Sequence, residues 1–264
     1  MSEQPIRFDD GAAYERSMGG WSRLAGQVFL DWLAPQAGLR WADVGCGSGA
    51  FSELVVERCA PSDVQGVDPS PAQLAFARAR PAARVATFQQ GDAMALPFAT
   101  DRFDAAVMAL VIFFVPEPAR GVAEMARVVR PGGVVAAYAW DMAGGGFPFA
   151  PIREELHALG VAIPQPPSAD ASRMDVLRGL WTDAGLTAVE TREITVQRTF
   201  ANLDDFWAHS TITGSIRPTI AGLSPGDLEQ LKTRVSARLP ADTGGRITYS
   251  SRANAIRGRV PSPA

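Results

Sequence analysis

A loop with glycines at alternate positions, Gly45, Gly47 and Gly49, stands between a predicted strand and a predicted helix. The strand covers Leu39–Val44 and the helix covers Ala50–Cys59, so the loop lies at the carboxyl end of a strand. Glycine permits a sharp turn and a close approach of the backbone to a ligand, because it has no Cβ atom. We expect three loop amides to point into the space above the strand, where the helix N-terminus adds partial positive charge. A nucleotide or nucleoside is the expected ligand.

Strands and helices alternate from Leu39 to Trp140, which predicts a parallel sheet with helices on both faces. Pro131-Gly132-Gly133 is expected to form a tight turn before the last strand of this region. Two later extended segments are expected to pair antiparallel at the sheet edge, which gives an α/β fold with seven strands, mostly parallel. The predicted strands are Leu39–Val44, Val64–Val67, Val85–Gln89, Phe103–Leu110, Val134–Trp140, Val189–Phe200 and Arg246–Arg257, and the predicted helices are Ala50–Cys59, Pro71–Arg80 and Pro118–Val129.

The other segments are expected to surround this sheet within a single domain, 1–264. An amphipathic helix over Tyr14–Leu33 makes 1–35 a predicted N-terminal helical lid, and 36–141 is the predicted cofactor-binding core. A glycine- and proline-rich connection around a helix at Pro151–Leu159 and a helix pair within Asn202–Leu239 do not fit the alternation. We expect these two segments, 142–172 and 201–243, to be cap insertions over the ligand edge of the sheet.

Composition limits the possible partners. A net charge of −3 and a pI near 5.5 disfavour a nucleic-acid partner, which usually requires a basic face. Membrane insertion is not expected, because no apolar run approaches the roughly 20 residues that span a bilayer. The residues at Met1–Asp10 do not resemble a signal peptide, so the cytoplasm is the expected location. Cys46 and Cys59 define neither a disulfide framework nor a metal site, so no metal is expected.

Acidic residues flank the glycine loop and the ends of the next two strands. Asp68 follows the glycines by roughly 20 residues, a distance at which an acid accepts hydrogen bonds from ribose hydroxyls. Asp92 comes after the third strand, where a carboxylate and the next backbone amide suit the edge of adenine. Asp43 precedes the loop, where it disfavours a pyrophosphate and can orient a cationic amine. An adenosine ligand with an amino-acid tail and no phosphate therefore fits better than a dinucleotide.

Five segments, in this order, resemble the motifs of class I S-adenosylmethionine-dependent methyltransferases. They are similar above all to the type 11 small-molecule enzymes, which include the ubiquinone and menaquinone biosynthesis C-methyltransferases. This resemblance implies a Rossmann-like fold, S-adenosyl-L-methionine as cofactor with S-adenosyl-L-homocysteine as product, and a small-molecule acceptor. The segments are Trp41–Phe51, Gly66–Asp68, Gly91–Phe98, Phe103–Val115 and Val128–Trp140, about half of the chain.

The resemblance also implies roles for individual residues. The methionine tail and the ribose would lie along the glycine loop, the ribose hydroxyls on Asp68, and the adenine against Pro69 and the edge formed by Asp92 and Ala93. An N-terminal aromatic residue, Tyr14 alone or together with Trp21, would close over the cofactor. The alternatives are that Asp68 caps the helix at Pro71, that Asp92 is a turn residue, and that both aromatic residues only pack. The implied cofactor-binding set is Tyr14, Trp21, Asp43, Gly45, Cys46, Gly47, Asp68, Pro69, Asp92, Ala93, Ala109 and Leu110.

The sequence departs from the family at Phe113-Phe114, where many relatives carry a histidine pair, so a general base from that position is missing. By chemistry the candidates for a base are His157 and His209, with Tyr138 and Asp141 near the end of a strand as further candidates. The alternative for each histidine is a surface or satisfied side chain.

Methyl transfer is an in-line displacement onto an oxygen, nitrogen or carbon nucleophile. The protein mainly holds donor and acceptor about 3 Å apart and excludes water, and a base is needed only for a protonated acceptor. We expect the acceptor pocket between the N-terminal helix, Gly144–Leu159 and Asn202–Leu239, in a monomer or homodimer. Two other functions stay open: a cofactor-binding protein of this fold that transfers no methyl group, and a nucleotide-dependent oxidoreductase.

Overall fold

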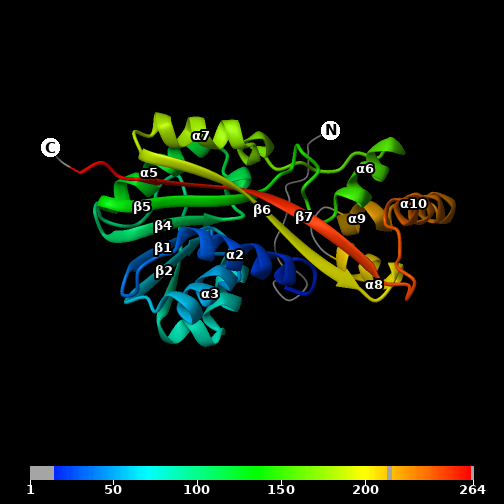
Figure 1. Ribbon diagram of the computed structural model, residues 1–264, viewed down its shortest axis with the longest axis horizontal. Coiled ribbons are helices and arrows are strands. Elements are labelled where there is room, and N and C mark those ends of the chain that lie inside the picture. Colours follow the sequence, from blue (N-terminus) through cyan, green and yellow to red (C-terminus); the bar gives the residue numbers. More distant parts are fainter. Residues whose placement is uncertain (1–14, 213–215, 263–264) are drawn as a thin grey trace.

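A computed structural model describes residues 15–212 and 216–262. Its centre is one seven-stranded sheet in the order β3-β2-β1-β4-β5-β7-β6 (Figure 1). Strands β1 to β5 are parallel, and β7 lies antiparallel between β5 and β6. The predicted α/β fold with its antiparallel edge pair is therefore confirmed. The strands are β1 Arg40–Val44, β2 Asp63–Asp68, β3 Ala86–Gln90, β4 Phe103–Ala109, β5 Val129–Trp140, β6 Thr187–Phe200 and β7 Ile247–Arg259.

Helices cover both faces of the sheet. On one face α2 packs against α3, β6 and β7, and on the other α5 and α7 pack against each other and against β4 to β7 (Figure 1). The α-helices are α2 Gly20–Leu33, α3 Ala50–Cys59, α4 Pro71–Arg78, α5 Pro118–Val128, α6 Ala150–Ala158, α7 Met174–Asp183, α8 Leu203–Ser210, α9 Ile216–Ala221 and α10 Pro225–Arg238. A π-helical turn, η1 Glu15–Gly19, precedes α2, and short 3-10 helices are η2 Pro81–Arg84, η3 Ile112–Phe114 and η4 Ala169–Ser172.

Each strand of the core begins and ends within a few residues of its prediction, because continuous apolar runs are typical of parallel strands buried on both faces. Strand β5 is the exception. It begins at Val129 and includes Pro131-Gly132-Gly133 as an irregularity, across which the register with β4 shifts. Gly132 there has φ +75°, and a Cβ on Gly133 would lie 2.5 Å from the Val129 side chain. The predicted turn is thus a bulge inside the strand.

Two helical regions differ from the sequence prediction. The described residues of the segment 201–243 form three helices, α8, α9 and α10, where a pair was expected. Helix α7 was not predicted, although its Trp181 is fully buried and donates a hydrogen bond from Nε1 to the carbonyl of Val135 at 2.9 Å. The sequence pattern of α7 is weak, because the helix has ten residues and only two of them are buried. A short amphipathic segment of this kind is weakly periodic.

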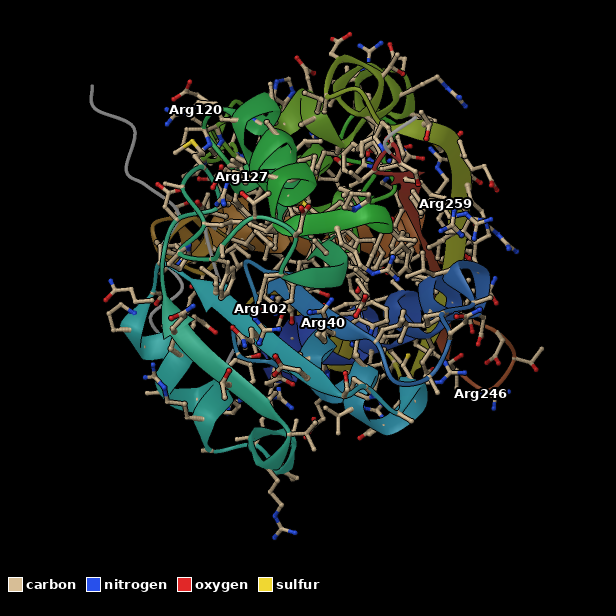
Figure 2. All side chains as sticks on the ribbon, turned by 90° about the vertical axis from the view of Figure 1, so that its left-hand side faces the viewer. Arg40, Arg102, Arg120, Arg127, Arg246 and Arg259 are labelled. Carbon is tan, nitrogen blue, oxygen red and sulfur yellow. The ribbon has the colours of Figure 1, made fainter. Side chains whose placement is uncertain are left out.

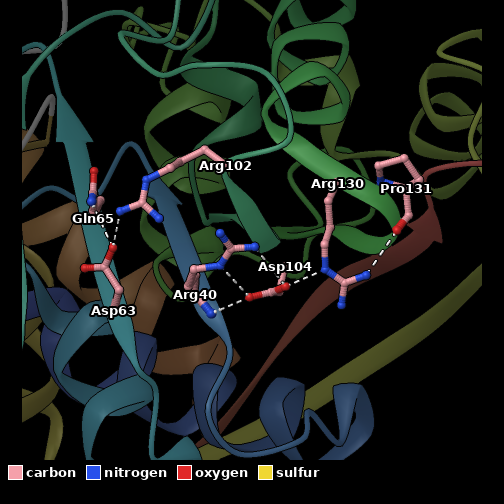
Figure 3. Close-up of polar contacts among 7 residues, drawn as sticks. All are labelled: Arg40, Asp63, Gln65, Arg102, Asp104, Arg130 and Pro131. Atoms are coloured by element: carbon pink, nitrogen blue, oxygen red, sulfur yellow. Dashed lines mark hydrogen bonds and ion pairs between the residues drawn. The ribbon is translucent and has the colours of Figure 1, made fainter.

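Ion pairs join the strands at the amino edge of the sheet. Asp104 accepts hydrogen bonds from Arg40, at 2.8 Å from the backbone nitrogen and 3.0 Å from Nε, and from Arg130 Nε at 2.5 Å (Figure 3). Arg102 pairs with Asp63 at 2.7 Å in the same region. Figure 2 looks toward this end of the molecule and labels Arg40 and Arg102 there. The hydrogen bonds from Arg40 hold the pKa of Asp104 well below its usual range.

Among residues 15–212 and 216–262, no helix combines the length and the apolar character that crossing a bilayer requires.

Candidate functional site

The glycine loop after β1 has a backbone that only glycine adopts without strain. Gly45, Gly47 and Gly49 have φ of +75°, +51° and +79°. A Cβ on Gly45 would lie 2.4 Å from the side chain of Val111, and one on Gly49 would lie 3.0 Å from that of Ala77. A Cβ on Gly47 would meet only Gln73 Oε1, at 3.9 Å, so the backbone at this position faces open space.

The expectation that three loop amides point into this space is wrong, because four amides of the loop donate within the protein. The amides of Gly45 and Cys46 both donate to the carbonyl of Val67, at 2.7 and 3.0 Å. The amide of Gly47 donates to Asp68 Oδ2 at 2.9 Å, and that of Gly49 donates to the carbonyl of Cys46 at 2.8 Å. Because these donors are already used, the loop is poorly suited to a phosphate, which binds through free backbone amides.

Asp68 ends β2 and fixes the loop to the next helix. Its Oδ2 accepts from Gly47, and its Oδ1 accepts from the amide of Ser70 at 2.9 Å. Burial raises the pKa of Asp68, and these two hydrogen bonds oppose the shift. A carboxylate has about four acceptor positions, so both oxygens keep a lone pair for a diol. The helix cap is provided by Ser70, whose Oγ accepts from Gln73, and not by Asp68.

Asp43 lies at the end of β1 with only 2% of its surface exposed. Its Oδ2 accepts a hydrogen bond from Ser52 Oγ at 2.6 Å, whereas its Oδ1 is buried without a partner. Burial raises the pKa of Asp43 to about 7, and the hydrogen bond from Ser52 opposes this shift. An unpartnered carboxylate oxygen in the wall of a cavity is a position where a cation is stabilised.

Burial also raises the pKa of the Cys46 thiol, and the neighbouring Asp43 adds to this effect. The side chain is buried, and a Cβ on Gly66 would lie 2.8 Å from its sulfur. A protonated thiol is a poor nucleophile, so Cys46 is a packing residue of the loop.

A cavity of about 700 Å³ opens above the carboxyl ends of β1 to β5, a usual size for a small-molecule site. Asp92 lies at its β3 end, where its Oδ1 accepts from the amide of Met94 at 2.8 Å and leaves the carboxylate exposed. Tyr138 lies at its β5 end, almost fully buried. Of the predicted cofactor-binding residues, those lining the cavity are Asp43, Gly45, Cys46, Gly47, Asp68, Pro69, Asp92, Ala93, Ala109 and Leu110.

Leu110 follows β4 in a left-handed conformation, with φ +64°. A branched side chain is strained there, and the contact that holds it is the hydrogen bond from its amide to the carbonyl of Tyr138, at 2.8 Å. The turn brings Val111 over Gly45. This turn lies beside the cavity at the neighbouring strands β1 and β4, where the strand order reverses and open α/β sheets bind ligands.

Ser22 is a lining residue that the sequence did not indicate. It lies on α2, one helical turn before Gly26, and a Cβ on Gly26 would lie 3.1 Å from Tyr138 Oη and 2.8 Å from Leu54. Residues one turn apart share a face of a helix, so Ser22 faces the β5 end of the cavity. Its Oγ is buried without a partner. No motif marks a single serine on an amphipathic helix, and only the fold places it.

Other predicted residues lie away from the cavity. Trp21 is fully buried and packs against Phe200 and Tyr249, with ring centroids 6.3 and 6.2 Å apart, so it is a core residue. Tyr14 lies outside the described residues.

Of the four candidates for a base, only Tyr138 lines the cavity. His157 is exposed on α6. His209 is 2.8 Å from the carbonyl of Asp205, and Asp141 forms an ion pair with Arg252 at 2.6 Å.

The described parts of the two segments that were predicted to cap the ligand edge of the sheet do not line this cavity. None of the described residues that line it comes from 142–172 or 201–243. Within the described part of the chain, no group of three or more metal-ligating side chains occurs either.

Residues 42–137 match the family described as methyltransferase domain. The chain contains a methyltransferase domain. A rice 2-methyl-6-phytyl-1,4-hydroquinone methyltransferase is 46% identical over 96 residues, 36% of this chain and 28% of that protein. The ubiquinone/menaquinone biosynthesis C-methyltransferase of Roseobacter denitrificans is 36% identical over 118 residues, 43% of this chain and 47% of that protein. The chain thus spans less than half the length of these two relatives.

The fold is similar to that of solved structures over more of the chain than residues 42–137. The structure of phosphoethanolamine N-methyltransferase 2 of Haemonchus contortus, in complex with S-adenosyl-L-methionine, matches with a TM-score of 0.61 and 18% identity over 97% of this chain and 58% of that one. The methyltransferase domain includes the glycine loop and the acids Asp43, Asp68 and Asp92. Ser22 and Tyr138 lie outside residues 42–137 but line the same cavity.

Proposed function

We propose that this protein binds S-adenosyl-L-methionine in the cavity above β1 to β5 and transfers its methyl group to a small molecule. The observation that carries this proposal is the set of acids at the ends of three neighbouring strands, beside a loop in which four amides already donate within the protein. Asp43 and Asp68 lie at the ends of β1 and β2, Asp92 follows β3, and all three line one cavity. This arrangement suits a cationic nucleoside better than a ligand with a pyrophosphate.

The residues present fit this cofactor. Asp92 and Ala93 would contact the adenine, and Asp68 would accept from the ribose hydroxyls with its remaining lone pairs. At the other end, the unpartnered Oδ1 of Asp43 would accept from the ammonium group of the methionine tail. Ser22 would donate its hydroxyl to the carboxylate of that tail. When bound, the cofactor supplies an activated methyl group on a sulfonium.

An acceptor would enter on the side where apolar residues line the cavity, Met94 and Phe114 to Pro116. One relative is named for methylation of a hydroquinone and another for ubiquinone and menaquinone biosynthesis, and the structural neighbour is named for phosphoethanolamine. These names support a small-molecule acceptor and leave its class open. The protein would hold the nucleophile in line and exclude water. Among the candidates for a base, Tyr138 has the best position, at the β5 end.

The test is a transfer assay with S-adenosyl-L-methionine that carries a tritium-labelled methyl group and a panel of phenols, quinols and amines. We expect labelled product and S-adenosyl-L-homocysteine in equal amounts with at least one acceptor. Binding of the cofactor without product from any acceptor would favour a protein of this fold that transfers no methyl group. Binding of NAD with hydride exchange would favour an oxidoreductase and contradict the proposal.

A further inference from the structure

Arg80 joins its own segment to two others that are distant in the sequence, η1 and the glycine loop with α3. It follows α4, and its guanidinium lies between two carboxylates: Nη2 is 2.6 Å from Oε1 of Glu15 in η1, and Nη1 is 2.6 Å from Oε2 of Glu53 in α3. Its Nε donates to the carbonyl of Ser48, in the glycine loop, at 2.6 Å. The hydroxyl of Ser48 donates to the same oxygen of Glu15 at 2.7 Å.

This cluster is more protected than an ordinary surface ion pair. The side chains of Arg80 and Glu53 are 13% and 16% exposed, and that of Glu15 is 28% exposed. Charge-assisted hydrogen bonds that are shielded from water are stronger than exposed ion pairs. The planar guanidinium of arginine presents its N–H donors in fixed directions, so it can bond to several partners at once. Arg80 also lies over the ring of Phe76, 5.5 Å from its centroid, which limits the positions of the guanidinium.

The cluster holds the loop beside the cavity. Ser48 lines the cavity and is 3% exposed, and both of its oxygens bond within the cluster. The preceding residue, Gly47, is held by Asp68. The segment from Asp68 to Arg80 thus holds the loop at two points, one at each end of α4. Glu15 connects the second point to η1, in which Ser17, Met18 and Gly19 are buried.

We propose that Arg80 is a positioning residue that couples cofactor binding to the docking of η1 against the glycine loop. The proposal rests on the proposed function, because the cofactor is the ligand of the loop. A ligand that stabilises the loop conformation stabilises the Ser48 contacts, and through them the position of Glu15. Such coupling is reciprocal. Loss of the Glu15 contact therefore lowers the affinity for the cofactor by the same factor by which the bound cofactor stabilises the docking of η1.

The test combines calorimetry with limited trypsin digestion. Arg16 is exposed in η1, so cleavage after it reports on opening of this turn. In the wild type we expect S-adenosyl-L-homocysteine to slow cleavage after Arg16 about fivefold or more. In Arg80→Ala we expect about tenfold weaker binding of S-adenosyl-L-homocysteine, the loss for a charge-assisted bond, and little protection of Arg16. Arg80→Lys should restore part of both effects.

Two further variants make the result specific. Glu15→Gln keeps a hydrogen-bond acceptor but removes the charge, and its effect on affinity should nearly vanish in the Arg80→Ala background, since both changes remove one interaction. Arg102→Ala is the matched control: Arg102 also pairs with an acid, Asp63, and lies over a phenylalanine ring, 5.3 Å from its centroid, but at the amino edge of the sheet. It should change neither readout.

Unchanged affinity in both Arg80→Ala and Glu15→Gln, or equal protection of Arg16 in the wild type and these variants, would overturn the coupling while leaving the proposed function intact. If the wild type binds neither S-adenosyl-L-methionine nor S-adenosyl-L-homocysteine, the proposed function fails, and the coupling fails with it.

Discussion

At the scale of single residues, some polar atoms around the cavity bond within the protein and others are buried without a partner. The amides of Gly45, Cys46, Gly47 and Gly49 donate within the protein, whereas Asp43 Oδ1 and Ser22 Oγ are buried without partners. An unsatisfied buried group costs about 1–3 kcal/mol, so a ligand that supplies the missing partner gains affinity. The unpartnered atoms therefore indicate which ligand groups the cavity accepts, an acceptor for the hydroxyl and a cation for the carboxylate.

The ionisation of Asp43 predicts a pH dependence of stability. Its pKa in the folded protein is about 7, above the unfolded value of 3.8, so its contribution to stability is full below about pH 4 and is lost as the pH rises through 7. Urea unfolding between pH 5 and pH 8 should show the free energy of unfolding of the wild type falling by about 2 kcal/mol more than that of Asp43→Asn. Parallel pH profiles for the two proteins would contradict this role of burial.

Ser22→Ala tests the tail-binding role of the hydroxyl. The variant should bind S-adenosyl-L-methionine about tenfold more weakly, because a hydrogen bond to a carboxylate is lost. It should bind the decarboxylated cofactor, which lacks only that carboxylate, as well as the wild type does. Ser251→Ala removes another buried hydroxyl without a partner, one that does not line the cavity, and should change neither affinity. Equal weakening for both ligands would place Ser22 elsewhere in the site.

At the scale of elements, the glycine loop and the strands around it were predictable, because their signals are local. Alternating apolar runs and glycines between Asp43 and Ala50 specify a strand, a turn and a helix with few alternatives. The loop's hydrogen bonds were not predictable, since its amides reach Val67 and Asp68 on the neighbouring strand. That neighbour is known only once the strand order is known. Local patterns thus predict elements, and the pairing of elements decides which atoms stay available.

Trp21 shows the same limit on a helix. Its position among the aromatic residues of an amphipathic segment is compatible with a lid or with the core. The structure places it against Phe200 and Tyr249, residues of β6 and β7 more than 170 positions later in the chain. Ser22, its neighbour, lines the cavity instead. Adjacent residues on a helix point about 100° apart, so the orientation of α2 about its axis decides which of them meets a ligand.

Gly45→Ala tests the loop as an element. Gly38→Ala is a matched control, because Gly38 has a similar φ, +79°, but a Cβ there meets nothing within 4 Å. We expect Gly38→Ala to lower the free energy of unfolding by about 1–2 kcal/mol through backbone strain alone. Gly45→Ala should add about 1–3 kcal/mol from the contact with Val111 and should also abolish cofactor binding. Equal effects of the two variants on stability and binding would show that the close approach to Val111 is unimportant.

At the scale of the whole molecule, the two edges of the sheet have different roles. The carboxyl edge holds the cavity, with strained backbone and unpartnered polar atoms. The amino edge holds the ion pairs of Asp104 and Asp63, in which every carboxylate is bonded (Figure 3). Strain at one edge is tolerated because the core and the opposite edge hold the strands in register.

Asp104→Asn should therefore affect stability and leave binding unchanged. The pKa of Asp104 lies below its unfolded value, so the stability from its ion pairs is present above about pH 4 and is lost as the pH falls further. We expect the free energy of unfolding of the variant to be about 1–2 kcal/mol lower than that of the wild type at pH 7, because solvent screens the contribution of the half-exposed Arg130. When the pH falls below about 4, the variant should lose less further stability than the wild type does. Its affinity for S-adenosyl-L-homocysteine should equal that of the wild type. A change in that affinity would contradict the separation of the two edges.

The whole account depends on the identity of the ligand, and isothermal titration calorimetry of the wild-type protein tests it most directly. We predict that S-adenosyl-L-homocysteine binds at one site per chain, that NAD does not bind, and that Asp68→Asn weakens binding at least tenfold. Asp63→Asn, at the opposite end of the same strand, should leave the affinity for S-adenosyl-L-homocysteine unchanged. Binding of NAD in place of S-adenosyl-L-homocysteine, or undiminished binding of S-adenosyl-L-homocysteine by Asp68→Asn, would contradict the account.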